Sequence, residues 1–542
     1  MAFGVLSIDP LHGHPPGTTL LEKVQPESHG IAMLHIPQPS DSKHDPLNMT
    51  RLRRELYFIT LIYGACVTGV VGPLLVPGFS IIATAFEIDL TQVTLLNGSL
   101  VMALGVSAYI CSPLASAYGR RLVYLFTTLM MIFGCVWGSY AQTYRSLLGS
   151  RIFQGLGMGS FFSLAGTASI NDVFFVHERG RRAGLWNFAV IVSVNVAPVI
   201  SGYVIMDLSW QWSFRILAIA FAISFVLVLF LMPETIFDRS IVNDREPTDN
   251  SGAKERNIET DQDFEKSVIP PTTQIYEESF KDSGATDEYE STQTNSAIRR
   301  VLGIEIVKFK SIKELSIMLI RPFTLIFNPI VLWACAMWSV TFSWTIIQGA
   351  VADQIYEAAP YNLSPTAVGL LIGIPPLIGS AIGTVLGGIL CDLAANNMAI
   401  RNSGIYEPEF RLPVLLPGII ATCIGSYGIG IAIADGLTVW ASAVFLGFLN
   451  FGVGMSCTAI ITYTNDACQD RAADAFGLAM LVKSAFAFGL TFILNDYYVS
   501  HGARIFFITW AALTTGITVL TVPLYIFGKR IRASRIFIGV AR

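Results

Sequence analysis

Long apolar stretches, each close to the length that crosses a lipid bilayer, constrain the fold of this chain more than any other feature. A membrane-spanning helix needs roughly 20 consecutive apolar residues, and the sequence contains twelve such stretches. They lie at 56–83, 93–114, 122–140, 147–170, 183–206 and 214–232, and then at 329–351, 366–390, 412–434, 437–461, 475–494 and 505–527. The pattern predicts an all-α membrane protein with twelve transmembrane helices.

The composition supports a chain that lives in a bilayer. Hydrophobic residues make up 53% of it and charged residues 14%, which is too apolar for an ordinary soluble protein. The net charge of -4 predicts no nucleic-acid partner. The eight cysteines occur singly, a spacing that favours neither a disulfide framework nor a metal site. We expect no cofactor, and we expect a monomer in the lipid bilayer.

A long polar segment between the sixth and seventh stretches divides the chain into two halves. Residues 233–322 are rich in Asp, Glu, Ser and Thr, and most of this segment has the composition of disorder. Between Lys308 and Arg321, basic and apolar residues mix at helical spacing, which predicts either an interfacial helix or an extension of the seventh span. We expect a tail 1–55, a half 56–232, a central loop 233–322, a half 323–528 and a tail 529–542.

The distribution of Lys and Arg predicts the orientation, because basic loops resist translocation. With a cytosolic N-terminus, the inside loops hold fifteen basic residues, among them Arg120, Arg179 and Arg471, whereas the outside loops hold Arg145 and Arg504. No basic flank followed by an apolar run marks a signal peptide at residues 1–50, so the first span is expected to serve as the targeting signal. Both termini and the central loop are therefore predicted to face the cytosol. Asn362 begins a glycosylation sequon in an outside loop, close to the eighth span.

The loop after the second span carries a motif with a tight turn and a basic pair. It reads Ser112-Pro113-Leu114 and, after Ser116, ends with Gly119-Arg120-Arg121. The glycine suits a tight turn, and a generic positively charged turn would explain the two arginines alone. Ser112 and Ser116 stand where the pattern G-x-L-x-D-x-x-G-R-R/K has a glycine and an acid.

The corresponding loop of the second half repeats the motif. After the eighth span the chain reads Gly388-Ile389-Leu390-Cys391-Asp392, and here the acid is present. A motif that recurs at equivalent places of two six-span halves indicates an internal duplication, and so predicts two pseudo-symmetric six-helix halves.

The fourth span contains an arginine within a glycine-rich segment, at Arg151, Gln154 and Gly155. An arginine inside a span costs roughly 2.5–3.5 kcal/mol, and it usually faces a polar cavity or a partner. Glycines allow close approach of a neighbouring helix. The alternative is an arginine that extends to the outer surface. We predict that Arg151→Ala abolishes the activity of the protein and leaves the amount of protein in the membrane unchanged.

The fifth span contains a proline among small residues, from Asn195 through Pro198 to Gly202. Proline breaks the helical hydrogen-bond ladder and permits a bend. This segment resembles a weakened G-P-x-x-G-G element of the drug:proton antiporter branch of the major facilitator superfamily, and the two loop motifs and the Arg151 motif resemble that superfamily's patterns.

Further stretches strengthen the likeness, at 4–6, 16–20, 172–180, 233–235 and 406–412. Together they resemble fungal twelve-spanner antiporters, nearest to the histidinol and polyamine permease-like branch. The resemblance implies a plasma-membrane secondary transporter that works by alternating access, with protons as the coupling ion and export as the usual direction. In the family, the acid replaced here by Ser116 helps to latch the two halves, so that latch is in question.

The ionisable groups of the predicted spans bear on the substrate. The spans as drawn contain no Asp, Glu or His, and their deep charges are Arg151 and Lys483. A polycation site normally needs carboxylates, so we expect a neutral, aromatic or anionic substrate. The candidates for substrate or proton coupling are Arg151, Asp172, Asn195, Gln348, Asn450, Tyr463 and Lys483.

These observations predict a transporter of a small organic molecule and no enzyme activity, since no nucleotide loop, HExxH motif or paired intramembrane acid occurs. The favoured activity is proton-coupled efflux of a drug-like compound or secondary metabolite. The alternative is proton-coupled uptake of a nutrient or organic cation. A receptor or channel is a different class, which twelve spans with matching loop motifs do not favour.

Overall fold

The computed structural model describes Val5, Pro15 and residues 17–20, 45–236, 311–468 and 471–534. Most of the central loop and parts of both tails lie outside the described residues. Of the two tail stretches used for the family resemblance, the structure describes only Val5 of 4–6 and residues 17–20 of 16–20. The spans of the first half are α1 (Arg51–Val71), α3 (Leu90–Tyr118), α4 (Arg120–Ser139), α5 (Tyr144–Gly159), α7 (Val176–Asp207) and α8 (Trp210–Leu231). Those of the second half are α12 (Pro329–Tyr356), α13 (Pro365–Arg401), α14 (Leu415–Ala434), α15 (Val439–Cys468), α16 (Ala472–Thr491) and α17 (Leu494–Val519).

Shorter elements complete several spans. Span 1 continues through η3 (Pro73–Gly78) into α2 (Phe79–Phe86), and span 12 continues into α18 (Thr521–Ala533). Span 4 changes its helix type along its length, since α5 leads into the π-helical η4 (Ser160–Ser169) and then α6 (Ile170–Val173), with right-handed helical backbone at both junctions. Because no single α-helix covers this span, eleven helices in the described part of the chain are long and apolar enough to cross a membrane by themselves. The fold is nevertheless the predicted all-α membrane architecture of twelve crossings.

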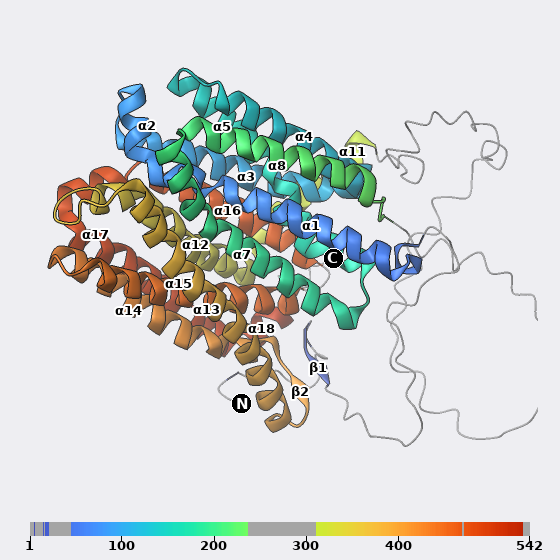
Figure 1. The fold of residues 1–542 in the computed structure, drawn as a ribbon. Helices are drawn as coiled ribbons and strands as arrows, with labels where there is room; N and C mark the ends of the chain where they lie inside the picture. Colours follow the sequence, from blue (N-terminus) through green and yellow to red (C-terminus); the bar gives the residue numbers. More distant parts are fainter. Residues whose placement is uncertain are drawn as a thin grey trace, which may run out of the picture.

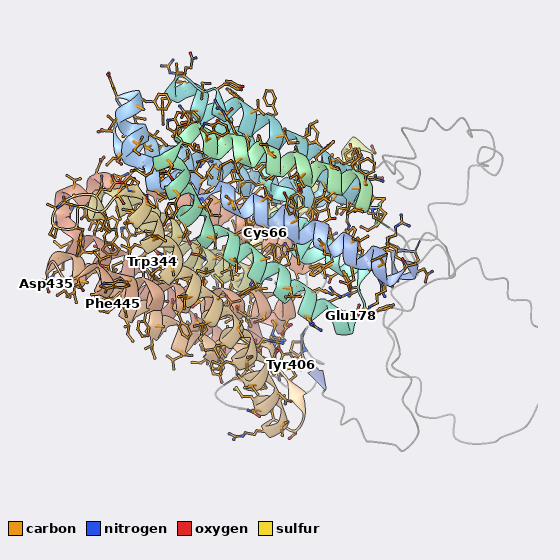
Figure 2. All side chains as sticks on the ribbon, viewed as in Figure 1. Cys66, Glu178, Trp344, Tyr406, Asp435 and Phe445 are labelled. Atoms are coloured by element: carbon orange, nitrogen blue, oxygen red, sulfur yellow. The ribbon has the colours of Figure 1, made fainter. Side chains whose placement is uncertain are left out.

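The two halves lie side by side, the first above and the second below in Figure 1. We call the end of the bundle where α1 begins and α18 ends the terminal side, and the opposite end, with α2 and the start of α17, the far side. In Figure 2, Glu178 and Tyr406 mark the terminal side and Asp435 the far side. Connecting loops on the far side are short, and the first half ends its last span, α8, on the terminal side.

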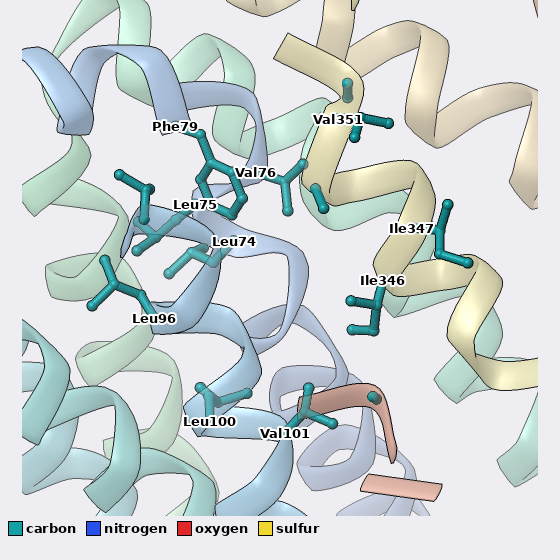
Figure 3. Packing of buried hydrophobic residues seen from close by; sticks show 14 of the residues in the cluster. Leu74, Leu75, Val76, Phe79, Leu96, Leu100, Val101, Ile346, Ile347 and Val351 are labelled. Carbon is teal, nitrogen blue, oxygen red and sulfur yellow. The ribbon is translucent and has the colours of Figure 1, made fainter. Parts of the chain in front are cut away.

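Hydrophobic packing joins the halves on the far side. One buried cluster there draws residues from both halves, because η3 of the first half packs against α12 of the second. Its members include Leu74, Val76, Phe79 and Val101 of the first half and Ile346, Ile347 and Val351 of the second (Figure 3). On the terminal side, each half has a buried cluster of its own. The structure is therefore closed at the far side.

Small residues let helices of opposite halves approach closely. A Cβ on Gly369 of α13 would lie 2.4 Å from the Pro198 carbonyl oxygen of α7, and one on Gly105 of α3 would lie 2.4 Å from Ser484 of α16. Gly202, beside the span 5 proline, lies against the start of α13 at Pro365 and Thr366. Pro198 and Gly202 thus form part of the contact between the halves.

Ion pairs stabilise each half separately on the terminal side. Arg120 pairs with Asp172 at 2.7 Å, and Arg411 pairs with Asp392 at 3.0 Å and Asp466 at 2.6 Å. Every ion pair between described residues joins two residues of the same half. In the described part of the terminal side, no ion pair therefore joins one half to the other. The two halves could move apart on this side without breaking an ion pair.

The loop motif of the first half obtains its acid from another place in the chain. Gly119 adopts a positive φ of 100°, which a residue with a side chain rarely adopts. The backbone N–H groups of Arg120 and Arg121 donate to the Glu234 carboxylate, at 3.0 and 3.1 Å. Glu234 follows span 6, so it caps α4 where the expected acid is replaced by Ser116.

The N-terminal tail lies on the second half. Strand β1 (Thr19–Leu20) pairs antiparallel with β2 (Ile405–Tyr406), and Thr18 donates to Glu407 at 2.7 Å. Burial raises the pKa of Glu407, but its hydrogen bonds from Lys529 and Arg532 outweigh burial and hold that pKa below the ordinary value. The tail, the loop before α14 and helix α18 are thus joined by one buried ionic cluster.

The structure defines both ends of α12, the seventh span. Helix α11 (Ile312–Ile320) is separated from α12 by the 3-10 segment η5 (Arg321–Phe327), and Asn328 caps the start of α12. At the other end, α12 continues to Tyr356, five residues beyond the predicted stretch. Asp353 therefore lies inside this helix and is 5% exposed, and the expectation of spans without acids is wrong at this residue.

Candidate substrate cavity

A cavity of about 120 Å³ lies between the halves, near the middle of the bundle. It is built from the broken segment of span 1 and from α3 and α7 on one side, and from α12, α13, α15 and α16 on the other. Its polar lining residues are Asn97, Asn195, Thr345, Gln348, Asn450, Lys483 and Ser484. None of the lining residues is Asp or Glu. A pocket with few polar groups in an apolar wall suits a small organic ligand.

Lys483 supplies the cationic group of this cavity. It lies in α16 and is 5% exposed, and its Nζ is 3.8 Å from the Phe342 ring centroid and 5.1 Å from that of Trp338. Within the described residues it has neither a hydrogen bond nor an ion pair. Two aromatic faces give a desolvated ammonium partial compensation, so the site is chemically suited to an anionic partner for this amine.

Three of the four amide side chains on the cavity wall form hydrogen bonds between helices. Asn450 donates to Gln348 Oε1 at 2.9 Å and to the Leu446 carbonyl oxygen, which joins α15 to α12. Asn195 of α7 donates to Ser380 Oγ of α13 at 3.3 Å, across the two halves. An amide in the membrane interior needs hydrogen-bond partners, and these side chains find them in each other, in a serine hydroxyl and in a backbone carbonyl oxygen.

Arg151 lies behind the cavity wall and is fully buried. Its guanidinium donates to the carbonyl oxygen of Val71 at 3.1 Å and to Gln154 Oε1 at 3.0 Å. Gln154 in turn donates to the Gly134 carbonyl oxygen at 2.9 Å. A third contact, to Gly72 O at 3.5 Å, places the arginine at the break between α1 and η3. The arginine thus satisfies carbonyls that the end of α1 leaves unpaired.

The remaining candidates lie away from the cavity lining. Tyr463 is buried near the terminal side against Trp333, while Asp172 and Asp392 form the ion pairs described above. Gly155 packs on the Leu100 carbonyl of α3, since a Cβ there would lie 2.4 Å from it. Asn362 has a positive φ of 48° in the loop between α12 and α13.

The sequence reasoning missed two groups that the structure brings to notice. Glu234 caps the loop motif from the end of span 6, and Asp353 lies at a contact between the halves. The signal for Glu234 was its place in the Pro233-Glu234-Thr235 stretch. For Asp353, continuing the helix to the next turn signal at Pro360 would have placed the acid inside it.

Comparison with known proteins agrees with this architecture. A family model described as the Major Facilitator Superfamily matches residues 56–491. Protein HOL1 of Saccharomyces cerevisiae is 24% identical over 544 residues, which cover 94% of this chain and 92% of that protein. The multidrug transporter DTR1 of Candida glabrata is 24% identical over 439 residues, or 80% of this chain and 77% of the relative.

A solved structure has the same fold. The xylose transporter XylE from E. coli, in a partially occluded inward open conformation, matches with a TM-score of 0.58 at 13% identity. The match covers 86% of this chain and 97% of that one. At this identity the likeness concerns the fold alone.

Proposed function

We propose that this chain, which belongs to the major facilitator superfamily, exports a drug-like compound or secondary metabolite across the plasma membrane, coupled to protons. The supporting observation is the cavity between the two halves, which contains a buried lysine without a hydrogen-bonding partner among the described residues. A site enclosed by two helical halves near the midplane is what alternating access requires. The relative named as a multidrug transporter supports a drug-like compound as the substrate.

The substrate is a small anion or an electron-rich aromatic molecule. Lys483 offers one positive charge, and Phe342 with Trp338 offers ring faces. At effective protein permittivity, one such charge contact contributes on the order of a few kcal/mol. A polyamine would meet a cation here and no carboxylate among the lining residues. Aromatic carboxylates therefore fit the cavity better than spermidine.

Proton coupling is assigned to the same cavity. An amine can give up its proton when buried, whereas a guanidinium retains it under all ordinary conditions. Lys483 is consequently the candidate that both binds an anion and exchanges a proton, with the acids at the span ends, Asp172 and Asp392, as alternatives. Their ion pairs with Arg120 and Arg411 tie these acids to each half's own surface.

The test uses purified protein in liposomes that contain a pH-sensitive dye and hold an imposed proton gradient. Benzoate, indole-3-acetate, the neutral aromatic indole and spermidine are added in turn. We expect benzoate or indole-3-acetate to dissipate the gradient faster than in protein-free liposomes, and spermidine to have no effect. A response to spermidine alone would contradict the substrate class and favour the uptake of an organic cation. The sign of the gradient that drives movement decides between export and uptake.

The orientation is tested separately by labelling in intact cells. Ala358 is exposed in the loop between α12 and α13 on the far side. An Ala358→Cys variant should react with a membrane-impermeant maleimide added outside, and a cysteine at position 250 in the central segment should react only after permeabilisation. Labelling of position 250 in intact cells would contradict a cytosolic terminal side.

A further inference from the structure

Asp353 places a buried carboxylate where the two halves meet on the far side. It lies in the last turn of α12, in the second half, and is 5% exposed. Its Oδ2 accepts a hydrogen bond from the backbone N–H of Ser80 at 3.2 Å. Ser80 lies in the first turn of α2, in the first half. The hydrogen bond thus crosses from one half to the other.

The carboxylate has only partial compensation for its burial. The first turn of a helix presents unpaired N–H groups with a partial positive charge, which favours an anion there. No ion pair with Asp353 occurs among the described residues, and its Oδ1 is buried without a hydrogen-bond partner. One oxygen is therefore paired with a backbone amide, and the other is left available for a proton.

The groups around Asp353 add negative charge and no positive charge. Glu357, one helical turn further along, is the charged group that acts on Asp353. Burial raises the pKa of Glu357, and its interaction with the Ser80 side chain opposes that rise. From α2 the facing groups are the N–H groups and hydroxyl at Phe79 and Ser80, which carry no titrating charge. The phenol rings of Tyr356 and Tyr361 lie on the α12 side, tilted at 54° to one another with their centroids 5.5 Å apart.

This geometry links ionisation of the carboxyl to separation of the halves. While the far side is closed, a charged Asp353 loses its hydration and meets the repulsion of Glu357. Opening of the far side would break the contact with α2 and return the carboxyl to water. Ionisation and opening therefore favour one another, and protonation favours the closed arrangement.

We propose that Asp353 is a proton-binding site that couples proton uptake from the far side to closure of that side. A proton from far-side water binds the open carboxylate, and the neutral carboxyl then enters the contact between α12 and α2. No other bond is made or broken. The proposal rests on the alternating access proposed above, and it adds a coupling site distinct from Lys483.

The experiment measures the distance between the halves on the far side by pulsed electron spin resonance. Spin labels are placed on Thr84→Cys in α2 and Ala358→Cys beyond α12, both exposed, after replacement of the eight native cysteines. The full-length protein is studied in nanodiscs, with pH lowered from about 7.5 to about 5.5, a range where a perturbed carboxyl titrates. We expect the short-distance population to rise by about twofold or more in the parent.

Three variants make the result specific. In Asp353→Asn, a permanently neutral side chain, we expect the short distance to dominate at both pH values, and in Asp353→Glu we expect the pH response to return. Asp435→Asn is the matched control, because Asp435 is a far-side acid whose ion pair with Arg504 lies within the second half. It should respond to pH as the parent does.

Two outcomes would overturn the proposal in distinguishable ways. If the parent shows two distances and Asp353→Asn keeps the full pH response, Asp353 is not the site, and alternating access still stands. If the parent shows a single distance at both pH values, with benzoate present or absent, alternating access and the Asp353 proposal both fail.

Discussion

Each half of the protein buries one cation in the membrane interior, and the two are treated differently. Arg151 of α5 is fully buried, and its guanidinium is bonded to carbonyl oxygens and an amide of its own half. Lys483 of α16 also lies inside a predicted span. Its ammonium, however, lies in the cavity against aromatic rings and has no hydrogen bond among the described residues. A buried charge held by several hydrogen bonds stabilises a fold, whereas one left without them is available to a ligand.

The largest expected effect tests the structural side of this comparison. Arg151→Ala leaves the carbonyls at the end of α1 and the Gln154 amide without their partner. Loss of one member of a buried charged network costs about 3 kcal/mol. We expect a lower melting temperature in detergent and less protein in the membrane, whereas the motif alone predicted a loss of transport at normal abundance.

The control for Arg151 is Arg151→Lys, which keeps the charge but lacks the planar fork that reaches two acceptors. The melting temperature of Arg151→Lys should lie between that of Arg151→Ala and that of the parent protein. A parental melting temperature in Arg151→Ala, combined with lost transport, would assign the arginine to substrate handling and remove the contrast with Lys483.

The second expected effect concerns transport and leaves stability nearly unchanged. Lys483→Gln removes the cavity charge, so the benzoate concentration that gives half-maximal dissipation of the proton gradient should rise by about thirtyfold, which corresponds to about 2 kcal/mol. Lys483→Arg should retain benzoate binding and lose the response to the proton gradient, because arginine keeps its proton. An unchanged benzoate concentration for half-maximal dissipation in Lys483→Gln, measured in the same liposomes, would show that the lysine is another structural cation.

A third, smaller effect is expected at the close contact between α13 of the second half and α7 of the first. Gly369→Ala introduces a Cβ 2.4 Å from the Pro198 carbonyl oxygen, and overpacking of this kind costs about 1 kcal/mol or more. We expect slower transport and a small drop in melting temperature. Gly388→Ala on the same helix has nothing within 4 Å of the new Cβ, so it should match the parent in both measurements.

The smallest effect comes from a cation at the surface. Arg504 pairs with Asp435 at 2.8 Å on the far side, and both side chains are about half exposed. Exposed pairs of this type contribute at most about 0.5 kcal/mol. Arg504→Gln should therefore leave the melting temperature and transport within experimental error. A large drop would mean that burial is a poor guide to the role of cations in this protein.

The sequence predicted the membrane architecture because hydrophobic length is a local property. Each span is recorded in about 20 neighbouring residues, and the twelve crossings of the structure follow those stretches. Even span 4, which the structure divides between the α-helices α5 and α6 and the π-helical η4, was recognisable by its length. The motif from Arg151 to Gln154 likewise marked a buried polar network, since charge inside a span requires a partner.

The tertiary structure alone decided which partners these residues have. Arg151 contacts carbonyls 80 residues away in the chain, and Asp353 contacts Ser80 across 273 residues. Such contacts depend on how helices of the two halves pack, and no local pattern of hydrophobicity records that packing. The sequence by itself therefore determined how many times the chain crosses the bilayer and that Arg151 and Lys483 are buried cations within it. The fold decided that one buried cation is bonded, that another faces the cavity and that one carboxylate joins the halves.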